Sequence, residues 1–163
     1  MKELAVIPGS FDPMTTGHVS LISRASALFS EVTVLVCINF DKTYMFEPEE
    51  RLEIAKASLS HLENVKVELY TGWLYEYLNA HKPCVVVKGV RNEKDFLYEK
   101  NMAEFNLEKS GVETVFLTSE KGEEDTSSTM LRTLLADGNF ENDLMMQNAQ
   151  KLIQKFYAEK RKK

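Results

Sequence analysis

Short apolar runs recur along the chain, and each is too short for a buried helix but long enough for a strand. Val32–Ile38 is rich in β-branched residues, which favour strands. Cys84–Lys88 is apolar up to its final lysine, as expected of a strand buried on both faces of a parallel sheet. The pattern predicts five strands, at Leu4–Pro8, Val32–Ile38, Val65–Leu69, Cys84–Lys88 and Thr114–Leu117.

The segments between these runs have helical periodicity. Apolar residues recur three and four positions apart from Val19 to Phe29, and Glu47 and Pro48 open a further helix with acidic residues in its first turn. Other helices are predicted over residues 72–81, 93–107, 127–136 and 143–159. Strands that alternate with helices form βαβ units with right-handed crossovers. The chain is therefore predicted to be an α/β protein, a single domain over residues 1–163, with a Rossmann-like five-stranded parallel sheet and helices on both faces.

Composition narrows the possible classes of function. The 163 residues carry a net charge of −5, which argues against bulk binding of nucleic acid. The basic cluster Lys160–Lys163 is interpreted as a solvated, frayed C-terminus. Cys37 and Cys84 lie in strand-like runs without metal-ligand spacing, which predicts buried free thiols. No leader or membrane-spanning run is apparent, so we expect a cytoplasmic protein without a membrane partner.

Ligands bind outside the carboxyl ends of parallel strands, so the strand-to-helix loops are where chemistry is expected. The first loop reads PGSFDPMTTGH and ends in Gly17 and His18 at a predicted helix start. Free N–H groups and the helix dipole make such a start a phosphate site, and His18 could donate to the same phosphate. The alternative is a histidine that only hydrogen-bonds the loop. The loop contains no GxGxxG, so ordinary dinucleotide binding is not indicated.

Three later loops offer cations or hydroxyl groups. Lys88 and Arg91 would form a cationic site at the sheet edge, unless both are simply solvated. Residues 126–129 are Thr-Ser-Ser-Thr at a predicted helix start. Four hydroxyl side chains are more than one N-cap requires, and together with free N–H groups they could bind a polyphosphate. The alternative is that they only cap the helix. Arg132 could add charge there. Lys42, in NFDKTYMF, is a further candidate, but a lone loop lysine is usually exposed.

Taken together, these segments resemble a known family. TTGH, from Thr15 to His18, carries the T-x-G-H signature of the nucleotidyltransferase superfamily, and TSSTMLR is similar to its second signature, ISSSxxR. The order of PGSFDPMTTGH, NFDKTYMF, PEERLE, KGVRNEKDFLYE and TVFLTS resembles the bacterial phosphopantetheine adenylyltransferases over nearly the whole chain.

The resemblance implies a transferase that moves the adenylyl group of ATP to 4′-phosphopantetheine by direct in-line attack, giving dephospho-coenzyme A and pyrophosphate. It implies Mg²⁺ carried with ATP, a homohexamer, and coenzyme A as a feedback ligand. The implied catalytic residues are His18, Lys42 and Arg91. The implied ATP-binding residues are Ser10, Phe11, His18, Gly89, Val90, Arg91, Glu99, Glu124, Asp125, Thr126, Ser127, Ser128, Thr129 and Met130. The implied substrate-binding residues are Ser10, Lys42, Leu74 and Lys88. The sequence supplies no metal ligands of its own.

The chain departs from the family pattern at several positions. Ser10 replaces threonine and keeps the hydroxyl, whereas Lys88 replaces arginine and loses a bidentate fork. Thr126 and Thr129 replace isoleucine and serine. Relatives that act on nicotinate mononucleotide or glycerol 3-phosphate share the SST pattern, but they carry H-x-G-H where this chain has Thr15. Such a relative, and a non-catalytic nucleotide or coenzyme A binding protein, are the alternatives.

Overall fold

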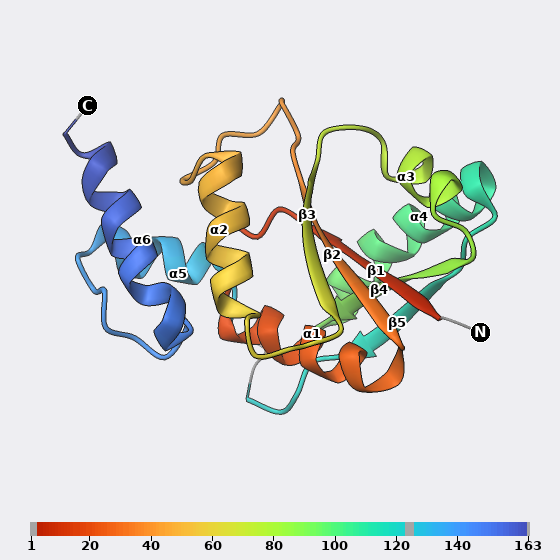
Figure 1. The fold of residues 1–163 in the computed structure, drawn as a ribbon, viewed down its shortest axis with the longest axis horizontal. Coiled ribbons are helices and arrows are strands. Elements are labelled where there is room, and N and C mark those ends of the chain that lie inside the picture. Colours follow the sequence, from red (N-terminus) through yellow and green to blue (C-terminus); the bar gives the residue numbers. More distant parts are fainter. Residues whose placement is uncertain (1–2, 123–125, 163) are drawn as a thin grey trace.

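In the computed structural model, which describes residues 3–122 and 126–162, the five predicted strands form one parallel sheet in the order β3-β2-β1-β4-β5. The predicted fold class is confirmed, and Figure 1 shows the twisted sheet between its helices. The strands are β1 (Leu4–Gly9), β2 (Glu31–Cys37), β3 (Val65–Tyr70), β4 (Cys84–Val90) and β5 (Thr114–Thr118).

Helices cover both faces of this sheet. One core packs α1 (Thr16–Leu28), α2 (Pro48–Ser58), α5 (Ser128–Ala136) and α6 (Gln147–Lys160) against side chains such as Ile7 and Val34. The opposite core packs α3 (Leu74–Ala80) against Val6 and Leu35, and α4 (Glu93–Ser110) runs on the same side (Figure 1). Alternate residues of β1 thus enter different cores, as the two-residue period of a strand requires.

Several predicted boundaries are corrected by the structure. Strand β4 continues past Lys88 to Val90, because Gly89 and Val90 still pair with Leu117 and Thr118 of β5. Helix α4 runs to Ser110 and stops at Gly111, which adopts the left-handed conformation (φ 70°) that favours glycine.

The C-terminal helix and the two thiols also differ from the predictions. Helix α6 starts at Gln147 and includes Lys160, whose side chain is only 29% exposed, so the prediction of a frayed tail is wrong for this residue. Cys37 and Cys84 are free thiols, as predicted, but half-buried rather than fully buried. Within the described residues, no helix is long and apolar enough to cross a membrane.

Candidate active site

A cavity of about 340 Å³ lies at the carboxyl edge of the sheet, where the strand-to-helix loops meet. Four segments wall it: the β1–α1 loop with the first turns of α1, the end of β4 with the start of α4, the end of β5, and the start of α5. The predicted site residues that line it are Ser10, Phe11, His18, Lys88, Gly89, Arg91, Glu99, Thr126, Ser127, Ser128 and Thr129. Loops far apart in the sequence therefore meet at one cavity, as the parallel topology predicts.

The β1–α1 loop holds His18 in a fixed orientation. Thr15 is the N-cap of α1, and its side chain accepts the backbone N–H of His18 while the His18 ring accepts the backbone N–H of Thr15. The Thr15 N–His18 Nδ1 distance is 3.0 Å. Phe11, with a positive φ of 47°, packs its ring edge-on against the imidazole at a centroid distance of 5.1 Å. Nδ1 is therefore an acceptor in the neutral ring, so Nε2 carries the proton that can be donated to a ligand.

The charge state of His18 follows from its surroundings. The pKa of His18 is lowered from 6.5 to about 4, mainly because burial disfavours the charged ring and also because the cations Arg91 and Lys88 lie nearby. At neutral pH the side chain is an uncharged hydrogen-bond donor. It therefore adds a hydrogen-bond donor to the site without adding another positive charge to the lining cations Arg24, Lys88 and Arg91.

Lys88 and Arg91 are each paired with a carboxylate of α4. Lys88 Nζ lies 3.2 Å from Glu99 Oε1 and donates to the carbonyl of Pro8 at 3.4 Å. Arg91 donates to both carboxylate oxygens of Asp95, at 2.8 and 3.4 Å. These hydrogen bonds hold the pKa of Asp95 below its usual value. All four side chains line the cavity, so the cationic site is built with its own counter-charges.

The start of α5 closes the cavity on the other side. The Ser127 side chain caps the helix by accepting the Met130 N–H at 3.1 Å, so the capping interpretation holds for this serine. Ser128 instead donates to the carbonyl of Pro13 at 2.8 Å, which ties α5 to the β1–α1 loop. Gly17 permits this approach, because a Cβ there would lie 2.2 Å from Thr126 Oγ1.

Other predicted site residues lie away from the cavity wall. Lys42 is exposed in the loop after β2, Leu74 begins α3, and Val90 and Met130 do not line the cavity. Glu124 and Asp125 lie outside the described residues. Arg132 does not line the cavity either; it donates to the Asp12 carbonyl at 2.7 Å and to Thr129 Oγ1 at 3.1 Å.

Two buried charged residues behind the loop were not predicted as functional. The Asp12 carboxylate accepts the backbone N–H groups of Met45 and Phe46, at 2.8 and 2.9 Å. Arg51, fully buried, donates to the carbonyls of Ser10 and Cys37 at 2.7 and 3.1 Å. Arg51 stands in the helical pattern of PEERLE and Asp12 in a polar loop, so no local signal distinguished either residue.

Comparisons with known proteins agree with this geometry. The cytidylyltransferase-like family model matches residues 6–134. The phosphopantetheine adenylyltransferase of Corynebacterium efficiens is 44% identical over 135 residues, which cover 82% of this chain and 85% of that protein. The enzyme of the same name from Corynebacterium glutamicum strain R is 37% identical over 155 residues, which cover 94% and 97%. The chain belongs to the phosphopantetheine adenylyltransferase family.

A solved structure extends the agreement to the fold. The bifunctional NMN adenylyltransferase/ADP ribose pyrophosphatase of Francisella tularensis, complexed with AMP and a manganese ion, superposes with a TM-score of 0.67 at 15% identity. The match covers 99% of this chain and 54% of that one. The predicted family and the prediction of a nucleotidyltransferase enzyme are confirmed.

Proposed function

We propose that the protein binds ATP and 4′-phosphopantetheine in this cavity and transfers the adenylyl group of ATP to the phosphate of 4′-phosphopantetheine. The observation that carries this proposal is that a neutral histidine donor, the cations Lys88 and Arg91, and a serine-rich helix start all line one cavity. Positioning and charge stabilisation, without a nucleophilic side chain, are what in-line transfer between phosphates requires. The names of the relatives support phosphopantetheine as the acceptor.

The reaction balances without a covalent intermediate on the protein. An oxygen of the acceptor phosphate forms a bond to the α-phosphorus of ATP, and the bond from that phosphorus to the bridging oxygen of the β-phosphate breaks. Pyrophosphate leaves with the electron pair. His18 Nε2–H would donate to an oxygen that gains charge in the transition state, and Arg91 would neutralise the same charge.

The remaining side chains would divide between the two substrates. On the ATP side we assign Phe11, Gly89, Val90, Glu99 and the segment 124–130, whose helix start offers N–H groups and hydroxyls to phosphate. On the acceptor side we assign Lys42, Leu74 and Lys88, with Ser10 between the two substrates. Lys42 lies in an exposed loop, so this assignment requires the loop to approach the acceptor after it binds.

A divalent cation, Mg²⁺ in this proposal, would arrive with ATP. Within residues 3–122 and 126–162, no three His, Cys, Asp or Glu side chains gather as a metal site. Asp95 and Glu99 line the cavity but are already paired with Arg91 and Lys88. Phosphate oxygens and water would thus hold the ion, which suits the preference of Mg²⁺ for few protein ligands. When bound, the ion supplies charge neutralisation on the phosphates.

We also propose that residues 1–163 form one domain and that the protein is cytoplasmic. Six copies would assemble into a homohexamer, and coenzyme A would inhibit the enzyme by feedback. Large apolar side chains on the α3–α4 side of the molecule are exposed, at 64% for Trp73 and 54% for Leu97, with Met102 and Phe105 nearby on α4. Tyr75 of α3 packs edge-on against Phe105. Exposed apolar surface of this kind is typical of a subunit contact.

Pyrophosphate release tests the function directly. ATP and Mg²⁺ are offered with 4′-phosphopantetheine, nicotinate mononucleotide or glycerol 3-phosphate, and the product is identified by mass spectrometry. We expect dephospho-coenzyme A from the first acceptor alone. Turnover only with another acceptor would refute the substrate assignment, and ATP binding without any turnover would favour a binding protein. His18→Ala should fold but lose turnover by about 10²-fold, the scale for one preorganised stabilising donor.

A further inference from the structure

The last residue of α6 reaches across to the segment that follows the Lys42 loop. Figure 1 shows α6 and α2 side by side and antiparallel, so the C-terminal end of α6 lies beside the start of α2. Lys160 Nζ donates to the backbone carbonyl of Met45 and lies 3.4 Å from Glu50 Oε2 and 3.7 Å from Glu47 Oε1. The same ammonium lies 5.5 Å from the centroid of the Phe46 ring.

The β1–α1 loop also holds this short segment, through Asp12. The Met45 and Phe46 backbone N–H groups donate to the two oxygens of Asp12, while the Met45 carbonyl accepts from Lys160. Phe46 is fully buried, so its ring fixes the position of the backbone between them. The segment begins three residues after Lys42. Lys160 and Asp12 therefore fix one end of the loop that carries Lys42.

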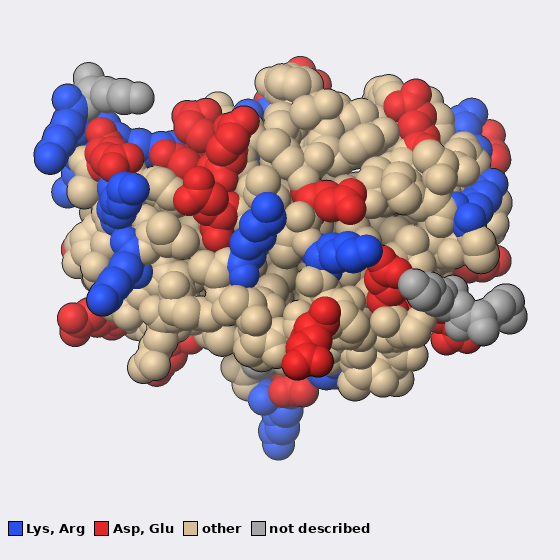
Figure 2. Space-filling model, viewed as in Figure 1, with Lys and Arg blue, Asp and Glu red and all other residues tan. Residues whose placement is uncertain are grey.

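Helix stability alone does not account for this placement of Lys160. A cation beside the N-terminus of α2 opposes the helix dipole, which favours anions there. Glu47 and Glu50 already complete a capping box at that end, with Glu47 N donating to Glu50 Oε2 at 2.8 Å. Figure 2 shows acidic side chains gathered over this end of α2, beside basic side chains of α6. Lys160 differs from an ordinary surface ion pair because its ammonium also donates a hydrogen bond to the Met45 carbonyl.

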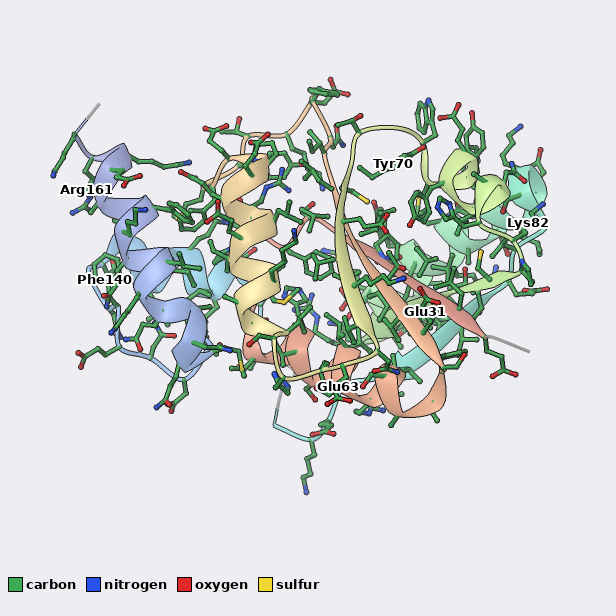
Figure 3. The ribbon with its side chains drawn as sticks, in the orientation of Figure 1. Glu31, Glu63, Tyr70, Lys82, Phe140 and Arg161 are labelled. Carbon is green, nitrogen blue, oxygen red and sulfur yellow. The ribbon has the colours of Figure 1, made fainter. Side chains whose placement is uncertain are left out.

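The neighbouring cation behaves differently. Arg161, labelled in Figure 3 at the end of α6, donates to Tyr157 Oη of its own helix at 3.3 Å and stacks over that ring. Lys162 is exposed and follows it. Of these three basic residues, the geometry thus singles out Lys160 as the one that reaches the loop.

We propose that Lys160 is a positioning residue for the acceptor-side loop 39–46: it fixes the Met45–Phe46 end so that Lys42 can meet the acceptor phosphate. The inference rests on the proposed function, because it requires Lys42 to bind the acceptor. It assigns the C-terminal helix a part in substrate recognition although Lys160 does not line the cavity.

The test compares three variants of the full chain. Lys160→Met keeps an aliphatic stem over Phe46 but removes the ammonium, Lys160→Arg keeps a charged donor, and Lys162→Met is the matched control. We measure kcat and the KM of each substrate, the melting temperature, and hydrogen exchange of the Met45 and Phe46 amides.

We expect Lys160→Met to raise the KM for 4′-phosphopantetheine about tenfold, the scale for losing one hydrogen bond from a charged group. The KM for ATP should stay within about twofold, because the ATP side of the cavity does not involve this segment. The two amides should exchange faster in Lys160→Met, whereas Lys160→Arg and Lys162→Met should behave like the wild type.

The outcomes separate the inference from the function on which it rests. If the wild type does not use 4′-phosphopantetheine, the proposed function fails first. If the wild type does use it and Lys160→Met matches Lys162→Met in acceptor KM, the positioning role is refuted, whether or not the amides exchange faster. An equal rise in both KM values with a large drop in melting temperature would show a merely structural residue and would also refute it.

Discussion

His18 should make the protein less stable in mild acid. Its pKa is about 4 in the folded protein and 6.5 in an unfolded chain, so the unfolded state binds more protons between these values. Because stability rises with pH wherever the unfolded state binds more protons, the histidine contributes its full effect above about pH 6.5. That contribution is lost as the pH falls toward 4.

The linkage relation gives the size of the effect. Relative to pH 8, the two pKa values predict losses of about 0.8 kcal/mol at pH 6, about 2 kcal/mol at pH 5 and about 3 kcal/mol at pH 4. The physical cause is the cost of charging a half-buried imidazole that has lost much of its hydration and lies near two cations, Arg91 and Lys88. Below pH 5 ordinary carboxylates begin to titrate as well, so the range from pH 8 to pH 5 isolates the histidine best.

The assay is urea unfolding at several pH values for the wild type and for His18→Gln. Glutamine can still accept the Thr15 N–H through its side-chain oxygen, but it does not titrate. The difference in unfolding free energy between the two proteins should change by about 2 kcal/mol from pH 8 to pH 5. A constant difference over this range, or an NMR titration that places the His18 pKa near 6.5, would refute the reasoning.

Three further changes test other parts of the site. Gly17→Ala should raise the KM for ATP about tenfold in steady-state assays, since its Cβ would press on Thr126 and displace the start of α5; an unchanged KM would contradict this. Asp12→Asn should lower the unfolding free energy by about 2 kcal/mol in urea, because an amide cannot accept both backbone N–H groups. Lys88→Met should raise the acceptor KM about tenfold while Lys88→Arg stays near the wild type, because arginine keeps the charge that faces Glu99; similar KM values for both would exclude a charge contribution.

The sheet could be predicted from the sequence because its signals are local. Each strand is a short apolar run, and the parallel topology then brings the loops with His18, Lys88 and Ser128 to one edge. The ends of elements were harder to predict. Apolar periodicity fades after Leu107, whereas α4 continues to Ser110, and the left-handed backbone of Gly111 rather than the apolar pattern ends the helix.

The hydrogen bonds that hold the site loops in place could not be predicted, because they join elements that are distant in sequence. Asp12 and Met45 are 33 positions apart, and Met45 and Lys160 are 115 apart. In the sequence, Arg51 has the spacing of a residue on the polar face of a helix. In the structure it is fully buried and donates to the Ser10 and Cys37 carbonyls. Sequence spacing shows which residues share a face, but it does not show which neighbouring element covers that face.

The carbonyl groups of the β1–α1 loop show how the site can be rigid before ATP binds. Those of Ser10, Asp12 and Pro13 accept hydrogen bonds from Arg51, Arg132 and Ser128, which come from two different helices. A loop held at three points keeps its hydrogen-bond donors in place, so little reorganisation is needed when charge develops on a bound phosphate.

The charged side chains around the cavity are also held in place before ATP binds. Without counter-charges, Lys88 and Arg91 would repel each other and a protonated His18. Glu99 and Asp95 neutralise the two cations. Burial helps to keep His18 uncharged. A triphosphate brings more negative charge than these two carboxylates together, so it can draw both cations toward itself. The site is thus stable when empty and still cationic enough to bind phosphates, which explains why a protein of net charge −5 can bind a polyanion.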